Sequence, residues 1–567
     1  MDSLNVMQAD RIFYNGAIYT ADHANRLTEA LAVGGGKVLC AGSTADAGWY
    51  KGPKTEMIDL QGKMITPGFI DTHLHAPGRV LSDLYNISLY DTAGLPEILQ
   101  QVDRFIKEHP EQDIYYGEGF SLGHFSGEEV SRGPRKERLD QICADKPVIL
   151  YSSDCHLAWL NSCAMKTFGV TGETPDPQGG LIEKDPRSGN PWGTLKEAAM
   201  RLIPEQQFSE EQVLEALTHF QSYLHSLGYT GIHSVSITAE PPLQAFFKLE
   251  QQGRLKLHVA SSVTVEPLDD LPAKFARIKT LRERYSRDRH RVTTAKFFAD
   301  GVVEGATAYL VKPYQPGAGK EPDYRGDFLW NQDKLKEAFS LANRAGLQVH
   351  VHSIGDAATS LVLDALEKTT GVNPAGCRNT ITHLQLVDPA DLKRFAALNV
   401  IASVQPYWHC KEPDWWSVVD YHMLGERAED EYPLQSLFAA GITVVSSSDH
   451  PVTPHPNPLR ALRAGITRNL TAEASYGLLP LDHPENTCYL LNRGERASLI
   501  DMIRSFTING AFAIFREQET GSLEPGKQAD LVVFDRDLFT TAPGDLEKIC
   551  LLETYFAGEP VYRSSAG

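Results

Sequence analysis

Histidines, one lysine and one aspartate stand at the ends of apolar, β-rich segments of this chain, where they could bind a metal ion. His73 and His75 lie two residues apart in ITPGFIDTHLH. Because alternate residues of a strand point to one face, both imidazoles are predicted to face the same side. Imidazole and carboxylate groups suit zinc, and catalytic zinc sites keep one position open for water. The further candidates are Lys296 in TTAKFFADG, His352 in VHVHSIGD, His383 in TITHLQ and Asp449 in SSSDHP.

The segments that carry these residues alternate with helical segments, which is typical of βαβ units. The candidates fall in the first, fourth, fifth, sixth and eighth of eight predicted strands. In a (β/α)₈ barrel the C-terminal ends of the strands meet at one face, where active sites are built. We therefore predict an α/β fold with a TIM-like barrel. Its predicted strands are residues 68–75, 230–236, 256–264, 294–301, 347–353, 379–386, 400–406 and 443–449.

The predicted barrel is flanked by smaller parts. Both ends of the chain hold short β-rich runs split by glycines, which predicts a small β-sandwich domain built from residues 1–66 and 519–567. The barrel itself is assigned residues 67–77 and 226–518. Residues 78–225 separate the first two barrel strands, whereas one crossover needs about 30 residues. We interpret 78–225 as an inserted subdomain that caps the active site.

The amino-acid composition limits the classes of molecule that the protein is expected to bind. The net charge of -19 argues against nucleic acid and anionic membranes, which require a basic surface. The first residues lack the basic and apolar regions of a signal peptide, and no apolar run approaches the roughly 18 residues of a membrane helix. The eight cysteines form no C-x-x-C pair, so reduced thiols and a cytoplasmic location are expected. A small-molecule substrate is expected, and the formation of a homo-oligomer is left open.

Lys296 is the unexpected member of the set, because an ammonium has no lone pair and repels a cation. ITPGFIDTHLH, the Lys296 strand, VHVHSIGD, ITHLQ, SSSDHP and GSLEPGKQADLVVFD together resemble the amidohydrolase superfamily. More narrowly they resemble amidohydrolase family 3, the YtcJ-like branch that includes N-substituted formamide deformylase. The resemblance implies a carboxylated Lys296 that bridges two divalent ions, with zinc as the expected metal. It assigns His73, His75 and Asp449 to one ion, and His352 and His383 to the other.

Further residues are proposed around this centre. The family's Asp-Gly-His pattern reads Asp154, Cys155, His156 here, so cysteine replaces the glycine. His156 is predicted to polarise the scissile carbonyl or to protonate the leaving group, with a structural loop histidine as the alternative. Asp154 and Asp300 are assigned to substrate binding. Trp408 follows the seventh strand and could line an aromatic pocket, although loop anchoring explains it equally well. His350 shares the strand face of His352 and is interpreted as a core or supporting residue.

The expected reaction is hydrolysis of a C–N bond of amide or formamide type. A divalent metal lowers the pKa of a coordinated water from about 15.7 to about 7. Asp449 would take the proton of that water and pass it to the leaving nitrogen. One alternative is a deaminase on the same fold, whose mononuclear members place a glutamate three residues after the fifth-strand histidine. That position is Gly355 here, followed by Asp356. The other alternative is a metal-free, non-catalytic binding protein, which metal analysis would distinguish.

Overall fold

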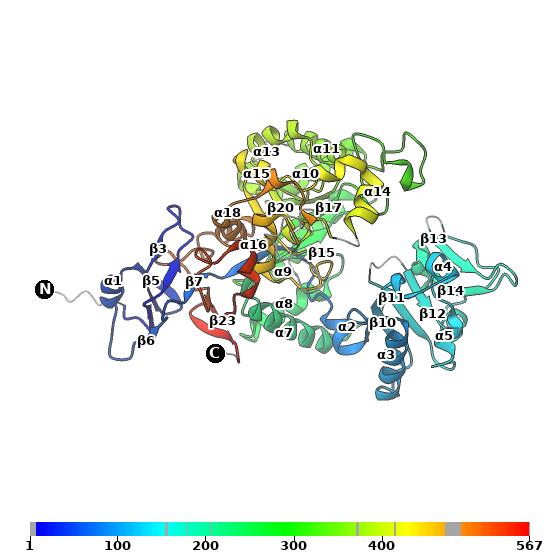
Figure 1. The fold of residues 1–567 in the computed structure, drawn as a ribbon, viewed down its shortest axis with the longest axis horizontal. Helices are drawn as coiled ribbons and strands as arrows, with labels where there is room; N and C mark the ends of the chain where they lie inside the picture. Colours follow the sequence, from blue (N-terminus) through cyan, green and yellow to red (C-terminus); the bar gives the residue numbers. More distant parts are fainter. Residues whose placement is uncertain are drawn as a thin grey trace. The chain divides into compact units, whose positions relative to one another are not determined.

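The computed structural model describes residues 7–153, 157–177, 180–204, 206–369, 374–412, 415–470 and 489–565. It divides into two compact units, residues 1–76 with 218–567 and residues 77–217. Figure 1 shows the fold coloured along the sequence. Among the helices of the described residues, none combines the length and apolarity that crossing a membrane requires.

The first unit contains the predicted barrel. Eight parallel strands pair in the order β21-β20-β19-β18-β17-β16-β15-β8, and each matches one predicted segment. Their side chains are almost all buried, as expected for parallel strands covered by helices. The prediction of an α/β barrel is therefore confirmed. The strands are β8 (Phe69–Leu74), β15 (Tyr229–Ile237), β16 (His258–Thr264), β17 (His290–Phe298), β18 (Gln348–Ser353), β19 (Thr380–His383), β20 (Ile401–Val404) and β21 (Val444–Ser446).

Helices connect successive strands, and capping residues mark where several of them begin and end. Asn331 caps α10 by accepting from the backbone N–H groups of Asp333 and Lys334, and Gly346 follows the helix with a positive φ of 65°. Asp388 caps the turn that leads into α13. The connecting helices are α8 (Pro241–Gln251), α9 (Leu271–Tyr285), α10 (Gln332–Arg344), α11 (Asp356–Glu367), α13 (Leu392–Leu398) and α15 (Leu434–Ala439), and they are followed by α16 (Pro458–Thr467), α18 (Leu499–Phe506) and α19 (Ile508–Ala513).

The barrel closes between its first and last strands, beside the predicted metal ligands. The Asp449 N–H donates to the His73 carbonyl at 2.8 Å, and the His75 N–H donates to the His450 carbonyl at 2.9 Å. Asp71 reinforces the seam, because one carboxylate oxygen accepts from the N–H groups of both His73 and Ser448 at 3.1 Å. The same hydrogen bonds that close the barrel therefore place His73, His75 and Asp449 next to one another.

Strands from both ends of the chain form two further sheets in this unit (Figure 1). One sheet joins β7 (Met64–Pro67) directly to β22 (Leu531–Phe534), so the N-terminal and C-terminal segments are hydrogen-bonded neighbours. One apolar cluster holds side chains of both sheets, including Leu31, Val33 and Leu531. The strand orders are β5-β4-β1-β6 and β24-β23-β22-β7-β2-β3, with β1 Arg11–Tyr14, β2 Ala17–Tyr19, β3 Leu27–Thr28, β4 Ala30–Gly34, β5 Lys37–Gly42, β6 Glu56–Asp59, β23 Leu551–Phe556 and β24 Glu559–Arg563.

The second unit, residues 77–217, has a mixed six-stranded sheet in the order β13-β14-β12-β11-β10-β9. Separate apolar clusters form within it, and Phe120, Phe125 and Trp159 pack edge to face in one of them. The unit therefore has a core of its own. Its strands are β9 (Ile87–Ser88), β10 (Tyr115–Phe120), β11 (Val148–Ser152), β12 (Leu157–Leu160), β13 (Gly180–Lys184) and β14 (Pro191–Glu197), and α3 (Leu95–Glu108) is its longest complete helix in the described ranges.

Candidate metal centre

Two histidines of β8 and the loop after it converge with Asp449, which follows β21. One oxygen of Asp449 lies 3.0 Å from His75 Nε2 and 3.3 Å from His73 Nε2. One donor atom from each of the three side chains lies within 4.8 Å of the others. No other group of three or more such residues approaches this closely within the described ranges. Asp449 adopts a left-handed backbone conformation, with φ of 56°, which is uncommon for a residue other than glycine. The geometry fits a divalent cation.

His352 and His383, from β18 and β19, face the same barrel interior. The His383 ring centroid lies 5.0 Å from that of His73 and 4.5 Å from that of His352. The structure thus brings together all four predicted histidine ligands and Asp449. Which of them bind a metal stays a prediction.

Hydrogen bonds leave one ring nitrogen of each of these two histidines available for a metal. His352 Nε2 lies 3.1 Å from the Gly301 carbonyl, which can only accept, so this nitrogen carries the proton and Nδ1 keeps its lone pair. His383 Nδ1 lies 3.1 Å from Gln405 Oε1, and the Gln405 amide donates to Ser447 at 2.8 Å, which fixes its orientation. His383 Nε2 therefore keeps its lone pair. Metal-binding histidines commonly have such a partner on the opposite nitrogen.

Burial keeps these imidazoles neutral. Burial, followed by the Lys296 charge, lowers the pKa of His73 to about 3 and that of His352 to about 4. The pKa of His383 falls well below its usual value, mainly through burial and then through His352. Burial acts to raise the pKa of Asp449, but His73 and His75 outweigh it and hold that pKa well below its usual range. His73, His352 and His383 are therefore uncharged and Asp449 is ionised, which is the form in which these groups bind a metal.

Lys296 points into this interior from β17 and is only 1% exposed. Its Nζ has no hydrogen-bond partner in the part of the chain that the structure describes, and it lies 5.0 Å from the Phe298 ring centroid. Burial lowers the pKa of the amine to about 7, although Asp449 acts in the opposite direction. Burying an amine without a hydrogen-bond partner destabilises the fold. The Lys296 amine therefore lacks a group that would stabilise it at this position.

The remaining predicted residues lie in different surroundings. Trp408 stacks on His383 with an interplanar angle of 12°, and its indole N–H donates to Thr453 at 3.0 Å. Asp300 is buried, and its two oxygens accept from the backbone N–H groups of Tyr309, Ile354 and Gly355. Asp300 thus braces the loop after β17 against the turn after β18. Asp154 and His156 lie outside the described residues.

The sequence interpretation missed two supporting residues, Asp71 and Gln405, and one contact of His350. Asp71 ties β8 to the loop after β21, and Gln405 orients His383. His350 contacts His73 directly. Asp71 has a readable signal, because it precedes His73 by two residues and so shares its strand face. Gln405 has none, since its role depends on the pairing of neighbouring strands.

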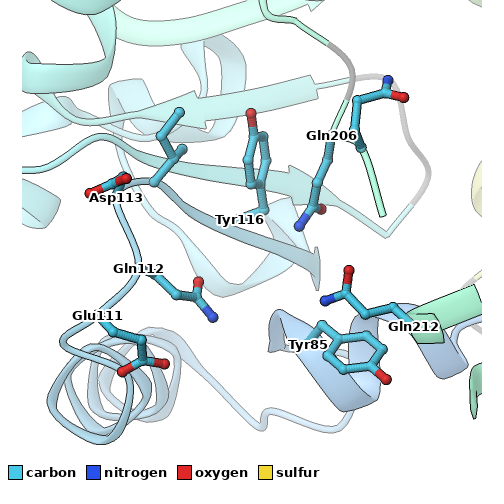
Figure 2. A pocket seen from close by; sticks show the side chains of 9 residues that line it. Tyr85, Glu111, Gln112, Asp113, Tyr116, Gln206 and Gln212 are labelled. Atoms are coloured by element: carbon cyan, nitrogen blue, oxygen red, sulfur yellow. The ribbon is translucent and has the colours of Figure 1, made fainter. Parts of the chain in front are cut away.

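A polar hollow of about 460 Å³ lies within the second unit (Figure 2). Two tyrosines and several amides line it, including Tyr85, Tyr116, Gln112 and Gln206. Gln206 is held by paired amide hydrogen bonds to Asn86, each 2.8 Å long. Its lining contains no cluster of potential metal ligands among the described residues. The barrel interior, with its perturbed histidines, is therefore the stronger candidate for chemistry.

Comparison with known proteins agrees with this geometry. The amidohydrolase family model matches residues 56–562. The putative amidohydrolase YtcJ of Bacillus subtilis is 29% identical, with 98% of this chain and 99% of the relative covered. N-substituted formamide deformylase of Arthrobacter pascens is 26% identical, with 97% of each chain covered. The crystal structure of an uncharacterized metal-dependent hydrolase from Pyrococcus horikoshii has a TM-score of 0.73 and 26% identity, covering 94% of this chain and 99% of that chain. The resemblance predicted from the motifs is confirmed: this chain belongs to the amidohydrolase family.

Proposed function

We propose that the protein hydrolyses a non-peptide C–N bond, of amide or formamide type, at a centre of one or two divalent metal ions, with zinc as the expected metal. The observation that carries the proposal is the convergence of His73, His75 and Asp449, whose donor atoms lie within 4.8 Å of one another. His352 and His383 add neutral nitrogens on the same interior. The family supplies the reaction class, and the relative named N-substituted formamide deformylase suggests the bond type.

The residues fit a metal centre on chemical grounds. His73, His75 and Asp449 would hold one ion, and His352 and His383 a second. The buried Lys296 amine, which has no hydrogen-bond partner among the described residues, would become a ligand after carboxylation. That step joins the neutral amine to carbon dioxide through a new N–C bond and releases one proton. Burial favours it, because a pKa of about 7 leaves much of the amine unprotonated near neutral pH.

Asp449 is the proton carrier in this proposal. The metal would supply a Lewis acid that makes a coordinated water acidic near neutral pH and polarises the substrate carbonyl. Asp449, whose pKa lies well below its usual range, accepts the proton of the attacking water. It then returns that proton to the nitrogen that leaves, so the amide yields an acid and an amine. A positioned acid–base group of this kind contributes about 10²–10⁴-fold to the rate.

One contact supports hydrolysis over deamination. Mononuclear deaminases of this superfamily have a glutamate three residues after the fifth-strand histidine. This chain has Gly355 at that position. A Cβ at Gly355 would lie 2.0 Å from the Tyr309 carbonyl oxygen, so no side chain fits. The next residue, Asp356, accepts from the Val311 N–H at 2.8 Å, near the start of α11. Neither residue takes the place of that glutamate.

We also propose which residues bind the substrate. Trp408 is half-buried beside His383 and offers an aromatic wall. We also assign substrate contacts to Asp154, and carbonyl polarisation or leaving-group protonation to His156. Asp300 would act on the substrate indirectly, through the loop and turn that it braces.

The proposal is tested by an activity screen on the purified protein supplied with Zn²⁺. N-formyl amines, N-acyl amino acids and cyclic amides are offered, and release of acid and amine is followed. We expect turnover in at least one of these classes, with formamides first. Aminated purines and pyrimidines serve as the comparison set. Ammonia release from that set, with no cleavage of any amide, would instead identify a deaminase.

A further inference from the structure

His350 lies across the barrel from His73 and contacts it. His350 belongs to the fifth barrel strand, β18, whereas His73 belongs to the first, β8. His350 Nε2 lies 2.8 Å from His73 Nδ1, and both side chains are 1% exposed. His350 is also the register partner of Lys296 on β17, so both residues point into the barrel.

The contact determines which nitrogen of His73 can bind a metal. A hydrogen bond between two ring nitrogens needs one proton and one lone pair. His73 Nε2 faces Asp449 and His75 at the metal centre, so this nitrogen must keep its lone pair for an ion. The His73 proton then sits on Nδ1 and is donated to His350 Nε2. His350 in turn carries its own proton on Nδ1.

The opposite arrangement would block the centre. If His350 Nε2 carried the proton, it would donate to His73 Nδ1. A neutral His73 would then be protonated on Nε2, 3.3 Å from the Asp449 carboxylate, and would donate to that oxygen. No lone pair of His73 would remain for a metal. The protonation pattern of His350 and the availability of His73 are therefore linked.

The arrangement has a local cost. His350 Nδ1 is buried and has no hydrogen-bond partner within the described ranges. The ring of His233, from β15, stands edge-on to His350 with centroids 5.1 Å apart and does not satisfy that nitrogen. A buried donor without a partner is destabilising. This cost is consistent with a role for His350 that core packing alone does not explain.

We propose that His350 is a positioning residue. Its Nε2 accepts a hydrogen bond from His73 Nδ1, and this keeps His73 Nε2 free to bind a metal. The inference rests on the proposed metal centre. Most metal-binding histidines donate to a carboxylate, a backbone carbonyl or water. Here the acceptor is a neutral imidazole, which orients His73 without adding negative charge next to the metal ligands.

The test measures metal affinity directly. Apo-protein is titrated with Zn²⁺ against a chromophoric chelator, and with Co²⁺ while its visible absorption is recorded. His350→Phe keeps a ring of similar size but removes the acceptor. It should weaken metal binding by about 10–100-fold, as loss of such partners typically does. His350→Gln places an amide oxygen within reach of His73 Nδ1 and should restore most of the affinity and the wild-type Co²⁺ spectrum.

The matched control is His290→Phe. His290 is also a fully buried barrel histidine, but it bonds to Ser261 and not to a predicted ligand. It should lose stability without a change in metal affinity. If His350→Phe does not fold, His350→Leu, which also lacks an acceptor, takes its place. Wild-type affinity in the acceptor-free variant, or equal weakening in the Gln and Phe variants, would overturn the inference. A wild-type protein that binds neither ion would overturn the proposed function as well.

Discussion

Replacing Asp449 with asparagine is expected to lower kcat by about 10²–10⁴-fold while the protein remains folded. Asparagine keeps the shape of the side chain, but its amide cannot take the proton of the attacking water. Its oxygen is also a weaker ligand beside His73 and His75, so some loss of metal is expected. The variant should therefore be assayed with metal in excess, alongside its metal content and thermal unfolding temperature.

Asp388→Asn is the matched control for this experiment. It removes the same charge, yet asparagine caps a helix about as well as aspartate, so the turn into α13 is retained. Its kcat should equal that of the wild type. A decrease of less than about tenfold in metal-saturated Asp449→Asn would rule out the proton-carrier role, because such roles contribute at least about a hundredfold.

Replacing Lys296 with alanine should remove the bridge between two metal ions and lower turnover by at least about a hundredfold. This loss should be larger than the loss caused by removing a residue that only hydrogen-bonds to a metal ligand. The substitution also leaves a hole where the buried side chain stood. Formate, acetate or propionate could enter that hole and supply the missing carboxylate. Added acid is therefore expected to restore part of the activity and to raise the number of ions bound per chain.

Lys296→Met serves as the control, because its side chain has nearly the same length and fills the hole without supplying a carboxylate. It should be inactive with or without added acid. If Lys296→Ala instead keeps its metal and its full activity in the absence of any acid, Lys296 does not bridge, and a single-ion centre replaces the two-ion proposal.

The barrel was accessible from the sequence because its strands have strong local signals. Apolar β-rich runs separated by capped helices predicted all eight strands, and the spacing of His73 and His75 placed them on one face. The family resemblance implied that Asp449 would join these two histidines, and the structure brings the ends of the first and last barrel strands together there. These features depend on periodicity and topology, which a single sequence carries.

The supporting contacts were not accessible in the same way. His350 and His352 share a strand face, and only the cross-barrel distance shows that His350 contacts His73. Gln405 follows the seventh strand, and its contact with His383 depends on how neighbouring strands are aligned. Asp300 accepts hydrogen bonds from three backbone N–H groups that only the folded chain brings together. Each of these contacts joins residues distant in sequence, so no local pattern records them.

We propose that the protein is a metal-dependent hydrolase whose centre includes His73, His75 and Asp449. The most direct test is the metal content of the purified protein, measured by elemental analysis, together with activity before and after chelation. We expect at least one divalent ion per chain, loss of activity on chelation and recovery with Zn²⁺. We also expect less bound metal in His73→Ala and His75→Ala. Full activity in protein freed of metal would contradict the proposed function.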